Sequence, residues 1–184
     1  MSSSRTRGLR RAAAPLTAAA LALGISAALT TPAAASGTYH GGAYVNGSGS
    51  MTDGDWNNEG VVNVSTHRNS NVACLWQTVL WADGYMSASD IDGIFGDQTH
   101  AATVRWQRDR GLVADGSAGR NTWTKAGQRL NNSNPGRSPD GFWYGGYAGK
   151  NTSFMVRSSS AGNWGFAGAD GIIRWASYNT RTCS

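Results

Sequence analysis

The sequence has few of the residues on which hydrolytic or metal-dependent chemistry depends. Its 184 residues include 2 cysteines and 3 histidines, and Glu59 is its single glutamate. The histidines are widely spaced and form no short metal-ligand motif, and neither a G-x-S-x-G nor a Ser-x-x-Lys sequence occurs. We therefore expect no catalytic residue, no metal site and no cofactor.

The acidic stretch at residues 53–59 leaves a glycosidase site and a calcium-binding loop as alternatives. A glycosidase needs a pair of carboxylates, and Glu59 with Asp53 or Asp55 could supply that pair. However, a Gly-rich segment is a poor place for the desolvated cleft that raises the pKa of a general acid. The same stretch begins like a calcium-binding EF-hand loop, but Asn58 and Val64 stand where that loop needs Gly and Glu. The sequence thus favours a solvated loop.

The first 36 residues predict a secretory signal peptide. Four arginines precede an apolar, alanine-rich stretch from residue 12 to 29, and small residues follow as far as Ser36. An uncleaved membrane anchor is the alternative, but the apolar stretch is short. No later segment is apolar enough to span a bilayer. We therefore expect a secreted protein without stable membrane insertion.

Removal of this peptide would bring the net charge close to zero. The chain has 16 Lys and Arg against 11 Asp and Glu, and four of the arginines precede residue 12. The remaining count is 16 − 4 = 12 basic against 11 acidic residues, a net charge of +1. The basic character of the whole chain is therefore no argument for a nucleic-acid partner.

The two cysteines, Cys74 and Cys183, allow one intramolecular pairing. In an exported protein a disulfide between them is favoured over a buried free thiol or an intermolecular bridge. Such a bond would hold the C-terminal strands, which are expected within residues 152–178, against the first helix, which is expected at residues 72–84.

A short pattern occurs twice in the middle of the chain. Residues 92–99 and 115–122 both read D-G-x-x-G-x-x-T, and an aromatic residue precedes Gln77 and Gln107 alike. Each D-G predicts a tight turn because Gly adopts positive φ without steric cost. The polar residues that follow favour the start of a helix. The stretch therefore predicts helix, turn, helix, turn, helix.

The spacing of apolar residues gives the expected bounds of these helices. The first covers residues 72–84, the second residues 97–110, and the third begins near Gly119. His100 is expected on the surface of the second helix. The apolar face of the second helix is expected to comprise Ala101, Ala102, Val104 and Trp106.

A set of residues at fixed spacings surrounds the two turns: Trp76, Gln77, Leu80, Gly84, Asp92, Gly93, Phe95, Gly96, Thr99, Ala102, Trp106, Gln107, Gly111, Leu112, Asp115, Gly116, Gly119, Thr122 and Trp123. In these residues the stretch from about 70 to 126 resembles the peptidoglycan-binding domain found beside many bacterial cell-wall enzymes. The departures from the family pattern are Trp76 and Trp106 in place of Leu and Phe, Thr103 in place of Val, and Asp83 in place of an apolar residue. The resemblance implies a three-helix module with peptidoglycan as its partner.

The resemblance also suggests which residues bind. It implies a groove for glycan or stem-peptide groups, and polar residues near the D-G turns are the candidates for its lining: Asp92, Arg105 and Asn121. Trp81 lies on a different helix face from the core residue Trp76 and is the best candidate for an exposed ring. Trp106 and Trp123 occupy core positions of the family.

The remaining segments complete the predicted organisation. Residues 37–65 read as a loose polar, Gly/Asn-rich arm with a possible short strand at 61–64, and the helical domain occupies residues 66–130. A linker at 131–141 leads to a small β-rich segment, residues 142–184. Its strands are expected at 152–158, 163–167 and 172–178. The predicted class is α+β, a three-helix peptidoglycan-binding-like module followed by a small Gly-rich antiparallel β segment.

The functional expectation is a secreted, non-catalytic peptidoglycan-binding protein, extracellular or associated with the cell wall. One alternative is a cell-wall hydrolase of the glycosidase type that uses the helices as its anchor. The other is a wall-anchored protein-interaction module. The sequence makes no prediction of the oligomeric state.

Overall fold

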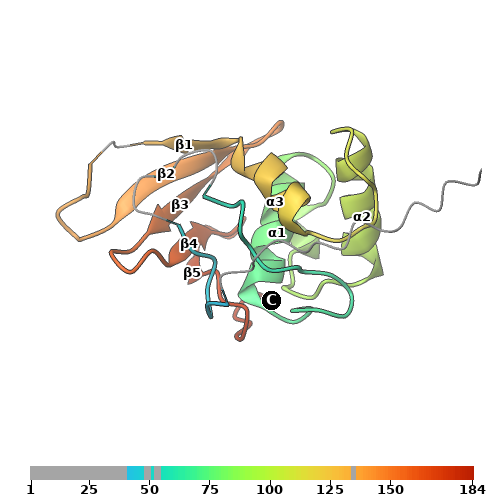
Figure 1. The fold of residues 1–184 in the computed structure, drawn as a ribbon, viewed down its shortest axis with the longest axis horizontal. Coiled ribbons are helices and arrows are strands. Elements are labelled where there is room, and N and C mark those ends of the chain that lie inside the picture. Colours follow the sequence, from blue (N-terminus) through green and yellow to red (C-terminus); the bar gives the residue numbers. More distant parts are fainter. Residues whose placement is uncertain (1–40, 48–50, 52–54, 134–135) are drawn as a thin grey trace, which may run out of the picture. The chain divides into compact units, whose positions relative to one another are not determined.

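The computed structural model describes residues 41–47, 51, 55–133 and 136–184, which belong to one compact unit. The predicted signal peptide and Asp53 lie outside these residues. Three helices come first along the chain and a five-stranded sheet follows (Figure 1). The predicted α+β class is confirmed. None of the helices in the described ranges is long and apolar enough to cross a membrane.

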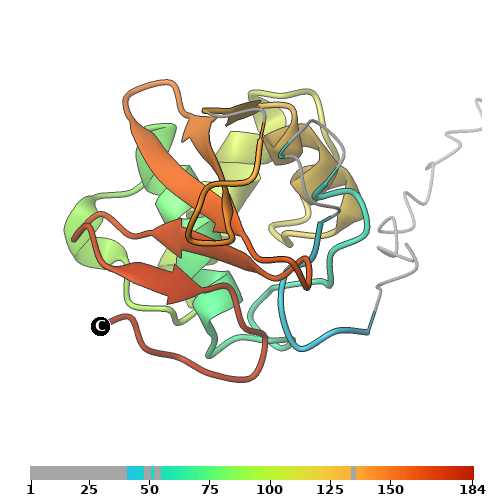
Figure 2. The same cartoon turned by 90° about the vertical axis from the view of Figure 1, so that its left-hand side faces the viewer.

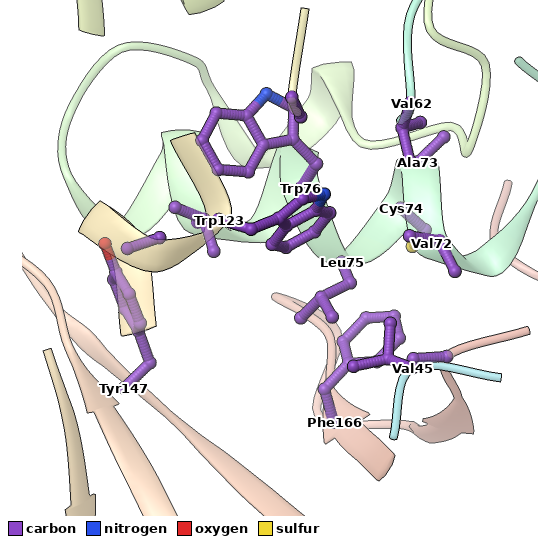
Figure 3. Close-up of a cluster of buried hydrophobic side chains, with 14 of the residues drawn as sticks. Val45, Val62, Val72, Ala73, Cys74, Leu75, Trp76, Trp123, Tyr147 and Phe166 are labelled. Carbon is purple, nitrogen blue, oxygen red and sulfur yellow. The ribbon is translucent and has the colours of Figure 1, made fainter. Parts of the chain in front are cut away.

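The first helix, α1 (Asn71–Ala82), is the centre of the fold. Ser70 caps it, since the Ser70 hydroxyl accepts a hydrogen bond of 3.0 Å from the Ala73 N–H. Every residue of α1 except Trp81 is buried, as expected for a helix with neighbours on all sides. Leu75 points toward Phe166 of the sheet and Val45, whereas Trp76 packs against Trp123 (Figure 3).

The other helices confirm the predicted order with small shifts of their bounds. A 3-10 turn, η1 (Ala88–Asp90), precedes α2 (Asp97–Arg108), and α3 (Arg120–Gly127) follows the second D-G turn. The prediction that Ala101 belongs to the apolar face of α2 is wrong, because its side chain is exposed while Ala102 is buried. The buried face of α2 follows the helical spacing i, i+3, i+4, i+7, i+8 from Thr99, and this spacing leaves Ala101 out.

The sheet is an antiparallel meander whose strands follow one another in sequence order. It comprises β1 (Leu130–Asn132), β2 (Trp143–Ala148), β3 (Ser153–Ser158), β4 (Trp164–Ala167) and β5 (Ile173–Trp175). Figure 2 looks onto the sheet, with the helices behind it. The three predicted strands are confirmed as β3, β4 and β5. Because β1 takes up the start of the predicted linker, the sheet follows α3 almost directly.

One face of the sheet joins the helices in a single hydrophobic core. Its buried side chains alternate along the strands, as a half-covered sheet requires: Tyr147, Phe154, Val156, Trp164 and Phe166. They belong to the same buried cluster as Leu75, Trp76 and Trp123. The helices and the sheet therefore share one core and are not two separately packed domains.

The expectation of a loose arm before the helices is wrong for the residues that the structure describes. Val45, Met51, Trp56 and Val62 are all fully buried in the shared core. The Trp56 ring lies 5.5 Å from the Trp123 ring, in an edge-on arrangement. In place of the short strand expected at 61–64 there is one isolated bridge, between Val62 and Ala118. This segment therefore stabilises both the helices and the sheet.

Candidate functional site

The repeated D-G-x-x-G-x-x-T pattern has a structural explanation in the first turn. The buried Gln77 side chain reaches from α1 into this turn, where its Oε1 accepts hydrogen bonds from the Asp92 and Gly93 N–H groups, at 3.1 and 2.7 Å. Its Nε2 donates to Asp92 Oδ1, the Ile94 carbonyl and Thr99 Oγ1. One amide thus satisfies backbone groups that would otherwise be buried without partners.

The second turn repeats this arrangement with Gln107. Its Oε1 accepts a hydrogen bond of 2.9 Å from the Gly116 N–H, and its Nε2 donates to Asp115 Oδ1, the Ser117 carbonyl and Thr122 Oγ1. Gly93 and Gly116 share a φ of +71°. At Gly116 a Cβ atom would lie 2.2 Å from the His100 ring, so a larger residue would have to displace that ring and adopt a strained backbone conformation. His100 was expected on the surface of α2, but its side chain is half-buried against this turn.

The predicted core tryptophans are confirmed, since Trp76, Trp106 and Trp123 are fully buried. The Trp76 ring lies 5.1 Å from the Trp106 ring and 5.2 Å from the Trp123 ring. The Trp76 Nε1–H donates to Thr103 Oγ1 at 2.8 Å. Threonine in place of the usual valine is therefore matched to tryptophan in place of leucine, because the larger ring brings an N–H that needs an acceptor.

Asp83, a further departure from the family pattern, joins the helices to the sheet. Asp83 follows α1 and is buried. Its Oδ2 accepts hydrogen bonds from Trp106 Nε1–H at 2.7 Å, Arg110 Nη2–H at 2.6 Å and Tyr147 O–H at 2.8 Å. Its Oδ1 accepts one from the Lys150 backbone N–H at 2.9 Å. Burial and the Asp83 charge raise the pKa of the Tyr147 phenol, which therefore remains a donor.

A basic cleft lies beside this network and shares Arg110 and Lys150 with it. It has a volume of about 490 Å³ and lies where the ends of α2 and α3 meet the loop between β2 and β3. We call it the junction cleft. The side chains that line it come from the turn after α1, from both helix ends and from that loop: Tyr85, Asp109, Arg110, Lys125, Gln128, Arg129 and Lys150. Its volume is within the range of small-molecule sites.

Two of the predicted binding residues lie apart from this cleft. Asp92 Oδ1 accepts hydrogen bonds from Gln77 and from the Ile94 N–H, so this oxygen closes the first turn. Asn121 is exposed in the first turn of α3. Neither residue lines the junction cleft. Contact of either with a ligand stays a prediction.

The other two predicted residues have different surroundings. The Arg105 guanidinium donates a hydrogen bond of 3.1 Å to the carbonyl of Tyr85, a cleft residue, so Arg105 lies near the rim. Trp81, the candidate for an exposed ring, is partly buried against the core. Its role in binding stays a prediction.

Sequence reasoning missed the basic residues that line the junction cleft. Lys125 and Arg129 come from the end of α3 and Lys150 comes from the loop between β2 and β3, and no motif joins them. The one signal available in the sequence is that Lys125 and Lys150 are its two lysines. Only the fold shows that both lysines lie beside the same cleft.

Glu59 is buried and connects the segment before the helices to the C-terminal segment. Its Oε2 accepts a hydrogen bond of 2.6 Å from the Tyr178 O–H, and its Oε1 accepts one of 3.1 Å from the Asn46 N–H. Burial is the main cause that raises the pKa of Glu59 to about 7, and nearby Asp55 raises it further. The two hydrogen bonds act in the opposite direction without offsetting burial.

Replacement of Glu59 with glutamine is expected to flatten the pH dependence of stability. Because the folded-state pKa is raised from 4.5 to about 7, the folded protein keeps a proton that the unfolded chain releases. The resulting stabilisation is complete below pH 4.5 and is lost as the pH rises through about 7. It amounts to about 3 kcal/mol, since one pKa unit corresponds to about 1.4 kcal/mol. Urea unfolding across this pH range measures it.

The matched control for Glu59→Gln is Asp97→Asn, which neutralises an exposed carboxylate at the start of α2. This variant should keep the pH profile of the wild type. A wild-type stability that stays constant from about pH 5 to about pH 8 would contradict the role given to Glu59.

Among the described residues, no three His, Cys, Asp or Glu side chains lie together as metal ligands would. Asp53, the first residue of the calcium-like stretch, lies outside those residues.

Comparison with known families agrees with the resemblance. Residues 73–125 match the family model described as “Putative peptidoglycan binding domain”. The match covers α2, both Gln-bonded turns and all but the outer ends of α1 and α3, and it stops before β1. No solved structure matches the chain.

Proposed function

We propose that this protein binds peptidoglycan without cleaving it and that it acts outside the cell, at the wall. The observation that carries the proposal is the family match over residues 73–125, together with the intact hydrogen bonding of both turns that define the family pattern. A module whose turns are locked in this way presents a fixed surface, which favours binding because little conformational entropy is lost.

Two further observations support an extracellular location. The N-terminal sequence has the basic, apolar and small-residue regions of a signal peptide. Cys74 and Cys183 form a disulfide, which persists in oxidising compartments outside the cytosol. A protein that lacks its first 36 residues after export would carry the net charge of +1 derived above.

The absence of cleavage is proposed from the chemistry of the side chains. The sequence contains none of the nucleophile or metal-ligand motifs considered above. Both oxygens of its one glutamate accept hydrogen bonds within the fold. A general acid in a glycosidase must instead reach the glycosidic oxygen of a bound sugar.

The expected result of mixing the protein with purified sacculi is retention without digestion. The full-length mature protein should pellet with insoluble peptidoglycan at about 0.15 M salt, because a preformed binding surface does not depend on exposed ion pairs alone. Muropeptide chromatography after long incubation should show no new products. A protein of similar size and charge without the family module serves as the pelleting control.

One observation favours the glycosidase alternative, namely the pKa of about 7 at Glu59, which is suited to a general acid. The sacculi experiment therefore includes Glu59→Gln. Reaction products that form with the wild type and disappear with this variant would establish the hydrolase. If products are absent with both proteins and both pellet, the binding protein is supported.

A further inference from the structure

The charges around the junction cleft are unbalanced. Four cationic side chains line it against one carboxylate, that of Asp109, which accepts a hydrogen bond from the Tyr85 hydroxyl. The charge of Arg110 is balanced by the buried Asp83, whose Oδ2 lies 2.6 Å from Arg110 Nη2. The cations that remain are Lys125, Arg129 and Lys150.

In the described part of the chain, no salt bridge involves Lys125, Arg129 or Lys150. Like charges around one concave surface raise the local potential, and low-dielectric walls concentrate it. An anion that enters the cleft relieves this repulsion, so the site favours negatively charged ligands.

The cleft is also held in shape by the elements around it. The Asp83 carboxylate fixes both the Arg110 guanidinium and the Lys150 backbone. Arg129 Nε donates a hydrogen bond of 2.6 Å to the Ala148 carbonyl, and the Arg129 carbonyl accepts one of 2.9 Å from the Ala148 N–H. The first of these bonds uses Nε, so the two terminal nitrogens of Arg129 are further donors. Such preorganisation lowers the entropy lost on binding.

The cleft extends beyond the segment that matches the family. Lys125 is the last matched residue, whereas Gln128, Arg129 and Lys150 follow it. The helix ends thus build one side of the cleft, and the loop between β2 and β3 supplies Lys150 on the other. Its ligand specificity is therefore set in part by the segment that follows the family module.

We propose that the junction cleft binds free carboxylate groups of peptidoglycan stem peptides. The proposal rests on the proposed wall binding, since the sugars of that polymer are largely uncharged and its stem peptides carry carboxylates. Lysine and arginine donate charge-assisted hydrogen bonds to carboxylates, and Arg129 can do so with two parallel donors. A volume of about 490 Å³ accommodates the end of a short peptide.

The test is calorimetric binding of a soluble muropeptide to the full-length mature protein. A second muropeptide, identical except that its carboxylates are amidated, is the ligand control. We expect the double variant Lys125→Gln/Lys150→Gln to weaken binding of the carboxylate form by about tenfold. Arg129→Gln should weaken it too. The amidated form should bind weakly to both wild type and variants.

A matched variant controls for the loss of two positive charges. Arg68→Gln/Arg120→Gln removes two exposed cations that do not line the cleft, and should change affinity less than about twofold. Unfolding curves of both double variants should coincide with that of the wild type, because all four side chains lie outside the core cluster.

The outcomes separate this inference from the function on which it depends. If the wild type binds neither sacculi nor muropeptide, both are overturned. If it pellets with sacculi but Lys125→Gln/Lys150→Gln keeps wild-type affinity for the muropeptide, only the cleft assignment is overturned. The cleft assignment is also overturned if Lys125→Gln/Lys150→Gln weakens binding to walls that retain phosphate polymers but not to walls freed of them. The cleft would then bind phosphate and not stem-peptide carboxylates.

Discussion

Replacement of Asp83 with alanine is expected to lower the free energy of unfolding by about 3–5 kcal/mol. The change leaves the Arg110 guanidinium, whose side chain is 16% exposed, without its counter-charge. It also removes the acceptor for the Trp106 indole N–H and the Tyr147 hydroxyl, both in buried contacts. Buried donors without acceptors lose their hydration without compensation. Urea unfolding at neutral pH measures the loss.

A double-mutant cycle controls for the loss of packing. Arg110→Met removes the charge while keeping a side chain that can cover Trp106, on which the guanidinium lies at 3.9 Å. In that background, Asp83→Ala should cost at least about 2 kcal/mol less than it does in the wild type. The role of Asp83 as the link between α2 and β2 is contradicted if Asp83→Ala alone changes stability by less than about 1 kcal/mol.

Reduction of the Cys74–Cys183 disulfide is the second change with a large expected effect. The bond joins residues 109 positions apart, and the chain-entropy model gives about 4.7 kcal/mol for a loop of roughly this length. Urea unfolding with and without reductant should therefore differ by about 4 kcal/mol. Cys183→Ala without reductant should reproduce the reduced protein, since Cys183 lies next to the C-terminus and its loss leaves the sheet strands intact.

The structure changes which segment this disulfide is expected to hold. The shared core and the bond from Tyr147 to Asp83 hold the strands against α1. The bridge instead holds the last residues beside Asn71, whose N–H donates to the Thr180 carbonyl and whose Oδ1 accepts from the Thr182 N–H. Hydrogen exchange should show residues 179–184 losing protection before β3 after reduction. Earlier loss in β3 would mean that the bridge supports the sheet directly.

Much of the fold could be predicted from the sequence where local signals were strong. The helices follow apolar spacing and are delimited by turns at Gly93 and Gly116, whose positive φ is a local property. By contrast, β2 contains Gly145 and Gly146 and β1 contains two asparagines, compositions that resemble loops. Pairing with β3 makes β2 a strand, and that pairing is a tertiary effect.

The burial of the segment before the helices could not be predicted for a related reason. Met51 and Trp56 each stand alone among Gly and small polar residues, so they show no period of two or of 3.6 residues. Their burial depends on cavities that distant elements create.

The junction cleft could not be predicted at all. Asp83 was visible as a departure from the family pattern, but its partner Tyr147 lies 64 positions along the chain. The same limit applies to Lys125 and Lys150, which only the β2–β3 loop brings to one cleft. Local sequence carries no information about such distances.

The contacts between the two ends of the described chain have a kinetic consequence. Val45 donates its N–H to the Ala176 carbonyl and accepts from the Trp164 N–H, and Glu59 meets Tyr178 across 119 positions. Contacts between residues so distant in sequence form late, because the intervening loop must close first. A three-helix module by itself would be expected to fold quickly. In this protein the core is complete only after the segment that contains Ala176 and Tyr178 has docked. Its folding rate should therefore resemble that of an all-β domain more than that of a helical bundle.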